Sequence, residues 1–297
     1  MVFSCLHTPF HMQYKTTKHW NGFWSHCRSD AWEQVLKRAG LIDCFPFIPA
    51  DFWEGFIVGY PEIFHVQSPP NSTSLSLYNS EFNDIISKEL AKGRYVRPFL
   101  AADLVHTISP FQSSPLSLIL KPGRPGKFRL VQNFSFPAAT SPHFPNPSIN
   151  HTIDMALFPC TWGKFSTIFL LISCLPPGSQ AATRDVMEAY CMIPLHPSQW
   201  PAVVVCMSDS FFCIDTCITF GTSPSCGAYG WVADVGAEIL RARGISPVDK
   251  WVDDHIFFCI LCEHLQGYNA ACLGWHEEIT HLGLRHDASC IYFNGVV

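Results

Sequence analysis

Apolar residues recur at helical spacing in three stretches of the chain, 31–39, 77–91 and 223–244. A glycine follows or closes each stretch, as is common at helix C-termini, because glycine readily adopts the left-handed conformation found there. The third stretch opens on Ser223 and Pro224, a pair favoured at the N-cap and the first helical position. The pattern therefore predicts three helices over these residues.

Runs rich in β-branched and aromatic residues, bounded by turn-forming residues, predict the strands. Strands are predicted over residues 116–120, 127–134, 248–252 and 256–261. Residues 181–190 and 193–205 contain the pattern of a further strand, a short turn and a second β-rich stretch. Residues 116–120 and 127–134 form a hairpin whose turn is rich in proline, glycine and basic side chains. Residues 248–252 and 256–261 form a tight hairpin whose tip holds Asp253, Asp254 and His255. Aspartate favours turns, so turn chemistry alone is one explanation of this acidic tip.

The most apolar run, residues 165–175, is far shorter than the roughly 20 residues that span a bilayer. It therefore predicts a buried core segment, and we expect no membrane partner. The N-terminal residues lack a charged leader followed by an apolar stretch. We expect an intracellular protein, cytoplasmic or nuclear and not secreted, with reduced thiols.

Composition indicates a folded protein without a strong overall charge. The chain has 297 residues, of which 48% are hydrophobic and 14% charged, and its formal net charge is −5. These values exclude full-length disorder and a collagen-like chain. They also exclude recruitment of a polyanion by an overall positive field.

Basic residues nevertheless gather between positions 88 and 129, where eight of them stand against two acidic residues. Lys121, Lys127 and Arg129 flank the turn of the first hairpin, where they are suited to grip a polyanion. The alternative is a solvated hairpin whose charges keep a sheet edge soluble.

A third acid accompanies the acidic tip. Asp185 lies near the end of a predicted strand, 68 residues before Asp253. Carboxylates from separate strands can bridge a pair of divalent ions that activates a hydroxyl and stabilises a leaving pyrophosphate. Adjacent residues of an extended chain point to opposite faces, so we expect Asp185 and Asp253 to be the principal ligands and Asp254 the lesser one.

Four motifs occur in an order that resembles the reverse transcriptase series. They are Lys127-Phe-Arg129, Asp185-x-x-x-Ala-Tyr190, Phe220-Gly221 and Trp251-Val-Asp253-Asp254. Further segments resemble reverse transcriptases of fungal retroelements, especially those of the tyrosine-recombinase (DIRS-like) type. These segments are Gly93-Arg-Tyr95, Phe134-Ser-Phe-Pro137, residues 193–200 and residues 250–254. The resemblance covers roughly residues 50–297.

The resemblance implies a site for RNA-directed DNA synthesis. Asp185, Asp253 and Asp254 would bind two Mg²⁺ ions, or Mn²⁺ in their place. The cations Lys121, Lys127 and Arg129 would neutralise a deoxynucleoside triphosphate. Tyr190 resembles the aromatic gate against a 2′-hydroxyl, and Phe220 and Gly221 resemble the segment on which nucleotide and template base pack. The implied partners are an RNA or DNA template with its primer.

The resemblance also implies an α+β architecture. Residues 1–70 form an aromatic-rich N-terminal extension, 71–180 a fingers-like region, and 181–297 a palm-like region, an antiparallel sheet backed by helices. A thumb is expected to be largely absent. Asn133 stands four residues after Arg129, where related enzymes often carry aspartate. With 14 cysteines and only 19 Lys and Arg residues, the chain is expected to be a truncated or degenerate copy.

Two alternatives to an active polymerase remain open. One is a catalytically weak or inactive retroelement remnant that at most binds nucleic acid. The other is a zinc-binding interaction module, because cysteine and histidine are zinc ligands. Its ligands would be Cys259, Cys262, Cys272 and His276.

Overall fold

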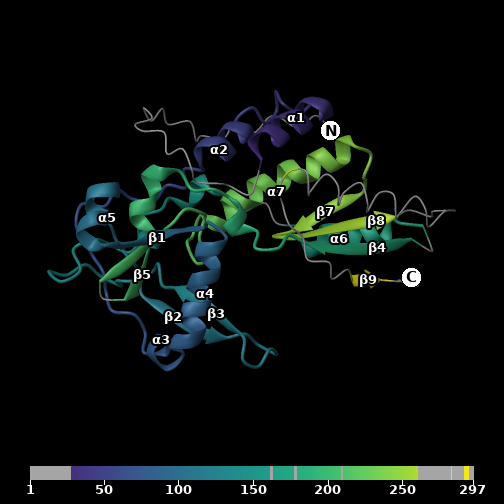
Figure 1. Ribbon diagram of the computed structural model, residues 1–297. Coiled ribbons are helices and arrows are strands. Elements are labelled where there is room, and N and C mark those ends of the chain that lie inside the picture. The colour runs from purple at the N-terminus through teal and green to yellow at the C-terminus, as the bar shows by residue number, and fades with distance from the viewer. Residues whose placement is uncertain are drawn as a thin grey trace.

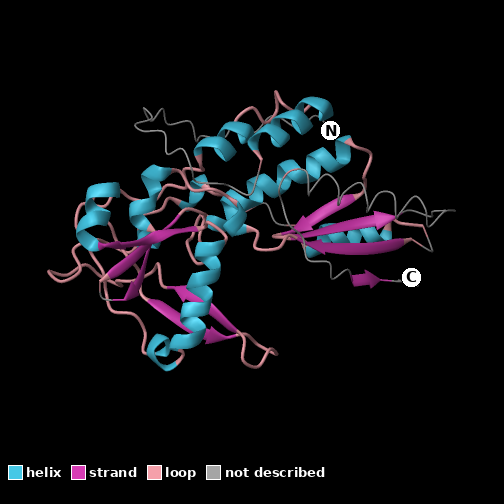
Figure 2. Ribbon diagram, in the orientation of Figure 1, coloured by secondary structure: helices cyan, strands magenta, loops and turns pink. Residues whose placement is uncertain are grey.

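The computed structural model describes residues 28–160, 163–176, 179–208, 210–259, 282 and 291–293. In these residues, helices accompany three antiparallel sheets (Figures 1 and 2). The expected mixture of helices and antiparallel strands is therefore confirmed. Within the same residues, none of the helices combines the length and apolar character needed to span a bilayer.

A four-stranded sheet lies at one end of the molecule (Figure 1). Its strands, in spatial order, are β7 (Val248–Trp251), β8 (Asp254–Cys259), β4 (Gln180–Asp185) and β9 (Ile291–Phe293). Helix α7 (Ser225–Ala242) packs against β7. The buried Lys250 joins the two elements, because its Nζ donates to the carbonyl of Gly230 at 2.9 Å and pairs with Asp234 at 2.9 Å.

The other end of the molecule contains a three-stranded sheet and a separate hairpin (Figure 2). The sheet consists of β1 (Tyr95–Leu100), β6 (Phe211–Asp215) and β5 (Val204–Ser208), and the hairpin of β2 (Leu116–Leu120) and β3 (Phe128–Gln132). Three helices accompany them, α3 (Ser74–Leu77), α4 (Asn79–Ala91) and α5 (Ala101–Ile108). Phe82 and Ile86 of α4 are buried with Leu116 and Leu118 of β2, so the helix anchors the hairpin.

A large apolar core joins these parts to the N-terminal helices α1 (Ser29–Ala39) and α2 (Ile48–Glu54). Trp32 of α1 stacks on Phe52 of α2 with ring centroids 4.9 Å apart. The same core includes Phe134, which follows β3, and Tyr229 of α7. The core also contains Phe212 of β6 and Phe257 of β8, so it joins the three-stranded sheet to the four-stranded one.

The predicted helices are confirmed as α1, α4 and α7, with shifted starts. The third helix begins at Ser225 with Pro224 as its N-cap, not at Ser223. The hydroxyl of Ser225 bonds to Thr219 O at 2.6 Å, and the N–H of Ser223 donates to Asn150 Oδ1 at 2.8 Å. Contacts with neighbouring loops therefore hold Ser223 outside the helix and Ser225 at its first position.

Two expectations were wrong. Residues 165–175 are not a buried segment: α6 (Phe165–Ser173) has no buried residue, and Phe165 is 77% exposed. Apolar content alone predicts burial only where another element covers the helix, and sequence does not show that. Residues 193–205 are not a continuous strand, because a 3₁₀ helix occupies Pro197–Ala202. Its two prolines lack the N–H that a strand ladder requires.

Candidate functional site

The three acids gather at one end of the four-stranded sheet. In the β4–β8 ladder, Asp185 lies directly opposite Asp254. The N–H of Val186 donates to the carbonyl of Asp253 at 2.9 Å, which extends the contact past the last strand pair. Val252 turns the chain with a φ of 55°, so the acids sit at the hairpin tip. All three are half-buried.

Electrostatic crowding marks this end of the sheet. Burial, and next the charge of Asp253, raise the pKa of Asp254 above its ordinary value. Two carboxylates that share a site repel each other, and a bound cation relieves that repulsion. Among the described residues, however, no three His, Cys, Asp or Glu side chains stand close enough together to form a metal-binding group. The backbones of the three acids are therefore neighbours, but their side chains do not converge on one point.

Tyr190 lies beside the acids. Its hydroxyl is 3.0 Å from the Sγ of Cys226, and its ring meets Tyr229 edge-on at 5.6 Å. Burial and the hydrogen bond with Cys226 raise its pKa well above the ordinary value, and the nearby charge of Asp253 adds to this shift. The tyrosine is therefore a neutral, fixed aromatic next to Asp253.

An aromatic contact connects Tyr190 to the basic hairpin. The rings of Tyr190 and Phe220 have centroids 5.1 Å apart. The guanidinium of Arg129 also lies over the ring of Phe220, 5.7 Å from its centroid. Phe220 is 62% exposed, so this ring presents an open apolar surface between the acids and the cations.

Gly221 fixes the loop that carries Phe220. It adopts a φ of +98°, and a Cβ at this position would lie 3.3 Å from the carbonyl oxygen of Gln132. Asn150 fastens the same loop, because its Nδ2 donates to the Gly221 carbonyl at 3.0 Å. The glycine thus permits close approach of the loop to the end of β3.

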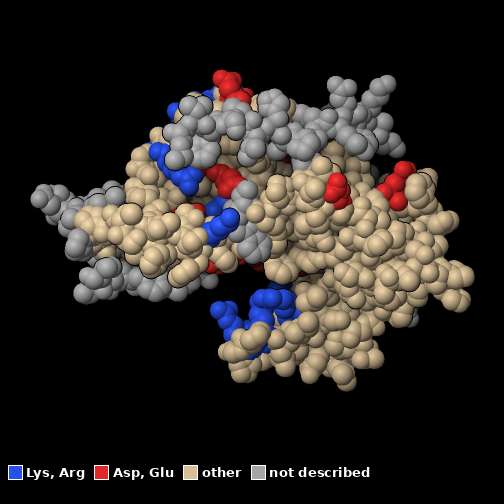
Figure 3. Space-filling view, turned by 180° about the vertical axis from the view of Figure 1, so that it is seen from behind, with Lys and Arg blue, Asp and Glu red and all other residues tan. Residues whose placement is uncertain are grey.

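The turn of the β2–β3 hairpin carries unpaired positive charge. The N–H of Lys121 donates to the carbonyl of Lys127 at 2.8 Å, which closes the turn. Arg124, Lys127 and Arg129 are exposed and Lys121 is half-buried. Within the part of the chain that the structure describes, none of the four forms an ion pair. In Figure 3, basic side chains lie on the lower lobe beside a hollow, and both acidic and basic side chains are visible above the hollow.

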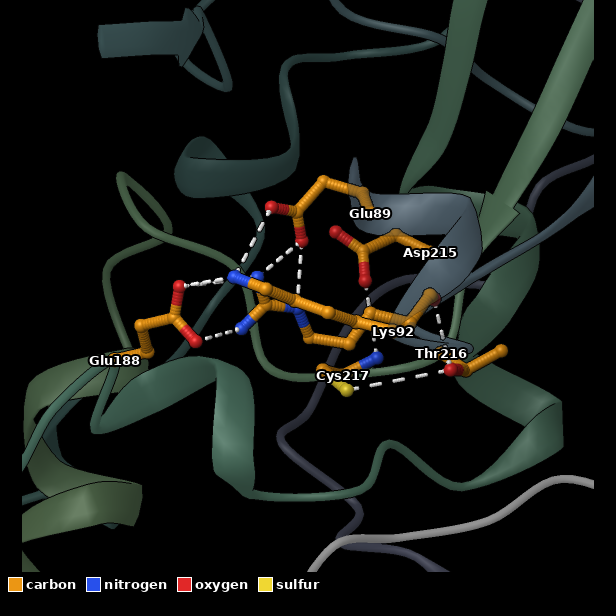
Figure 4. Close-up of polar contacts among 7 residues, drawn as sticks. Glu89, Lys92, Glu188, Asp215, Thr216 and Cys217 are labelled. Atoms are coloured by element: carbon orange, nitrogen blue, oxygen red, sulfur yellow. Dashed lines mark hydrogen bonds and ion pairs between the residues drawn. The ribbon is translucent and has the colours of Figure 1, made fainter. Parts of the chain in front are cut away.

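The structure also shows a charged cluster that the sequence reasoning did not assign. Arg94 immediately precedes β1, and its side chain is only 4% exposed. Its guanidinium binds the carboxylates of Glu89 and Glu188 (Figure 4). Lys92 also pairs with Glu188. The motif Gly93-Arg-Tyr95 was a signal for Arg94, but its partner Glu188 lies 94 positions away. Such a distant pairing has no local signature.

The zinc alternative rests mostly on residues outside the described ones. Cys259 is the last residue of β8. Cys262, Cys272 and His276 all lie outside the residues that the structure describes. The zinc set therefore stays a prediction.

Comparison with solved structures identifies the fold. The chain is similar to foamy viral protease-reverse transcriptase in complex with an RNA/DNA hybrid, with a TM-score of 0.52 and 12% identity over 87% of this chain and 32% of that one. It is also similar to the CSH mutant of prototype foamy virus protease-reverse transcriptase (TM-score 0.52, 14% identity, 86% and 32% covered). A foamy viral complex with double-stranded DNA gives a TM-score of 0.50 at 12% identity, with 89% and 44% covered.

These similarities establish a reverse-transcriptase-like fold. The chain spans less than half the length of each of these viral proteins. No protein-family profile matches the chain, and no curated protein sequence matches it.

Replacing Gly221 by alanine is expected to lower the free energy of unfolding by roughly 1–3 kcal/mol, because the backbone conformation is unfavourable for other residues and the new Cβ crowds Gln132. Urea denaturation measures the change. Gly123→Ala is the control, since its φ is +67° but no described atom lies within 4 Å of the new Cβ. An equal loss in the two variants would show that the contact with Gln132 is not tight.

Because Asp215 is buried, we expect the free energy of unfolding to depend on pH. Burial raises its pKa in the folded chain to about 7, against 3.8 ordinarily. The folded state therefore keeps a proton that the unfolded state releases, so this contribution to stability is complete below pH 3.8 and is lost as the pH rises to 7. Asp215→Asn keeps the oxygen that accepts from the N–H of Cys217 but does not titrate. We expect the variant to gain stability relative to wild type across this interval, measured by urea denaturation; a constant difference would contradict the assignment.

Proposed function

We propose that this protein is an RNA-directed DNA polymerase domain that transfers a nucleotide from a deoxynucleoside triphosphate to a primer 3′-hydroxyl. One observation carries the proposal: Asp185 lies opposite Asp254, with Asp253 at the same hairpin tip. Tyr190, which is within electrostatic range of Asp253, contacts Phe220, and Phe220 in turn contacts Arg129. Under this proposal the four-stranded sheet is the palm and the β2–β3 hairpin belongs to the fingers.

The acids fit a divalent metal in donor chemistry. Mg²⁺ prefers oxygen ligands, and all three candidate ligands are carboxylates at one end of the sheet. Burial, and next the charge of Asp253, raise the pKa of Asp254. Asp185 and Asp253 would be the principal ligands. Asp254 lies directly opposite Asp185 in the ladder, so its side chain is on the same face and would be the third ligand. Two such ions, once bound, would lower the pKa of the primer hydroxyl and neutralise the leaving pyrophosphate.

The hairpin cations would bind the triphosphate. Lys121, Lys127 and Arg129 lie around one turn without carboxylate partners among the described residues, so their charge is available to phosphate oxygens. Arginine is especially suited to this task because its guanidinium matches phosphate geometry. The hairpin would thus place the negative charge of the nucleotide on the side of the site opposite the acids.

The aromatic residues would select the nucleotide. Phe220 offers an exposed ring on which a base can pack, and Gly221 lets the backbone approach it. Tyr190 is fixed by Cys226 and Tyr229, so it cannot swing away from an added 2′-hydroxyl. We propose that it excludes ribonucleotides by this steric contact.

The template would be RNA or DNA with its primer. Two of the similar viral structures hold double-stranded DNA or an RNA/DNA hybrid, which supports a duplex partner here. The sequence motifs further favour a fungal DIRS-like retroelement as the source.

A second candidate is a remnant that binds nucleic acid with little or no catalysis. It is favoured by the absence of a closed group of three metal-binding side chains among the described residues. Asn133 favours it too: its Oδ1 accepts from the N–H of Ser135 at 3.2 Å and supports a local turn. No described contact joins its side chain to Arg129.

Primer extension on RNA and DNA templates with Mg²⁺ distinguishes the two candidates. The wild type is expected to incorporate deoxynucleotides distributively. Asp253→Asn is expected to lose more than the roughly 10–100-fold typical of residues that only support a metal ligand. Asp249→Asn, a same-sized change on β7 of the same hairpin, should retain activity.

The negative outcome is equally specific. If the folded wild type retains a labelled primer–template in a gel-shift assay but incorporates nothing on either template, with Mg²⁺ or Mn²⁺, the chain is a binding remnant. If Asp253→Asn extends primers as well as the wild type, the acids are not the catalytic group.

A further inference from the structure

The turn between Asp185 and Tyr190 is held by a residue from another part of the fold. We propose that Arg94 is a positioning residue that acts through Glu188 to fix the placement of Asp185 and Tyr190 relative to each other. Only residues 186–189 separate the acid from the aromatic ring. This inference rests on the proposed function, in which both side chains contact the incoming nucleotide or its metal.

The contact between Arg94 and Glu188 is bidentate. Nη1 of Arg94 donates to Oε2 of Glu188 at 2.8 Å, and Nη2 donates to Oε1 at 3.3 Å. A guanidinium that faces both oxygens of a carboxylate fixes orientation as well as distance. The glutamate therefore cannot rotate without losing one of the two bonds.

Arg94 is itself anchored away from the turn. Its Nε donates to Glu89 of α4. Its backbone carbonyl accepts from the N–H of Thr216 at 3.0 Å and from the Thr216 hydroxyl at 2.9 Å. Figure 4 shows Glu89 and Glu188 on different sides of the cluster. The arginine is thus attached to the helix and sheet at the hairpin end of the molecule, and the turn is tied to them.

The turn needs this support because its backbone is unusual. Glu188 has a φ of 56°, a conformation that residues other than glycine rarely adopt. One side of the turn is fixed by the bond from Val186 to Asp253, and the other by the burial of Ala189 and Tyr190. Glu188 at its centre depends on Arg94 and Lys92.

The charges of the pair persist at neutral pH. Burial alone would raise the pKa of Glu188, but hydrogen bonds from Arg94 and Lys92 lower it to about 2. The carboxylate is therefore ionised in any assay near neutrality. Lysine at position 94 would keep the positive charge but could not donate to both carboxylate oxygens as the planar guanidinium does. Glutamine at position 188 would keep the shape of the side chain but not its charge.

Steady-state primer extension with Arg94→Lys and Glu188→Gln tests the proposal. Because the loosened turn carries Tyr190, we expect the KM for deoxynucleotides to rise and their preference over ribonucleotides to fall, each by roughly tenfold, the lower end for supporting residues. The double variant should be no worse than the more severe single variant, since both changes break the same contact.

Two further measurements separate positioning from loss of folding. Glu238→Gln breaks the exposed pair with Arg241 on α7 and should change neither kinetic quantity. Hydrogen exchange at the amides of residues 186–190 should accelerate in Arg94→Lys and Glu188→Gln, while exchange in the centre of α7 stays at the wild-type rate. This readout needs no polymerase activity.

Each outcome decides a different claim. A wild type that incorporates nothing refutes the proposed function, and exchange at 186–190 still decides whether Arg94 holds the turn. An active wild type whose variants lose activity only in proportion to their unfolded fraction, with unchanged KM and sugar preference, overturns the positioning role. Additive effects in the double variant, or unchanged exchange at the turn, overturn it as well.

Discussion

The register between β4 and β8 is the constraint on which the candidate site depends. It sets Asp185 opposite Asp254, and the hydrogen bond from Val186 to Asp253 continues that alignment into the hairpin tip. A slip of one residue would turn the side chain of Asp185 to the other face of the sheet. The contact of Lys250 with Gly230 of α7 holds β7 against the helix. Packing of the β7–β8 hairpin against α7 therefore helps to determine whether the acids meet.

The second requirement is that a basic hairpin faces these acids in a chain with net negative charge. Local placement achieves this: four cations surround the β2–β3 turn, and the Arg129–Phe220–Tyr190 contacts connect that turn to the acidic tip. The cluster around Arg94 adds a second connection, which joins Glu89 of α4 to Glu188 in the turn between Asp185 and Tyr190. A nucleotide placed between the parts would meet positive charge on one side and crowded carboxylates on the other. That arrangement suits a negatively charged substrate and a divalent cation together.

Sequence predicted the features that depend on neighbours along the chain. The glycine after α1, the proline-rich turn after β2 and the turn after β7 have local causes, and the structure confirms them. Of the acidic tip, however, Asp254 and His255 belong to β8 and only Asp253 lies in the turn. Features that depend on distant partners were missed or wrong. Nothing near Arg94 indicates that Glu188 will meet it, and nothing within residues 165–175 indicates that α6 lies exposed. The pairing of Asp185 with Asp253 was predicted from a third acid at a predicted strand end and from ordered motifs that resemble a known family, not from their spacing along the chain.

The most direct test of the central claim is anomalous diffraction from crystals of the protein grown with primer–template and Mn²⁺. The account predicts manganese bound by Asp185 and Asp253, and loss of this signal in Asp185→Asn with the β4–β8 register unchanged. A structure that retains the register but holds its manganese elsewhere, or holds none between these two acids, would contradict it.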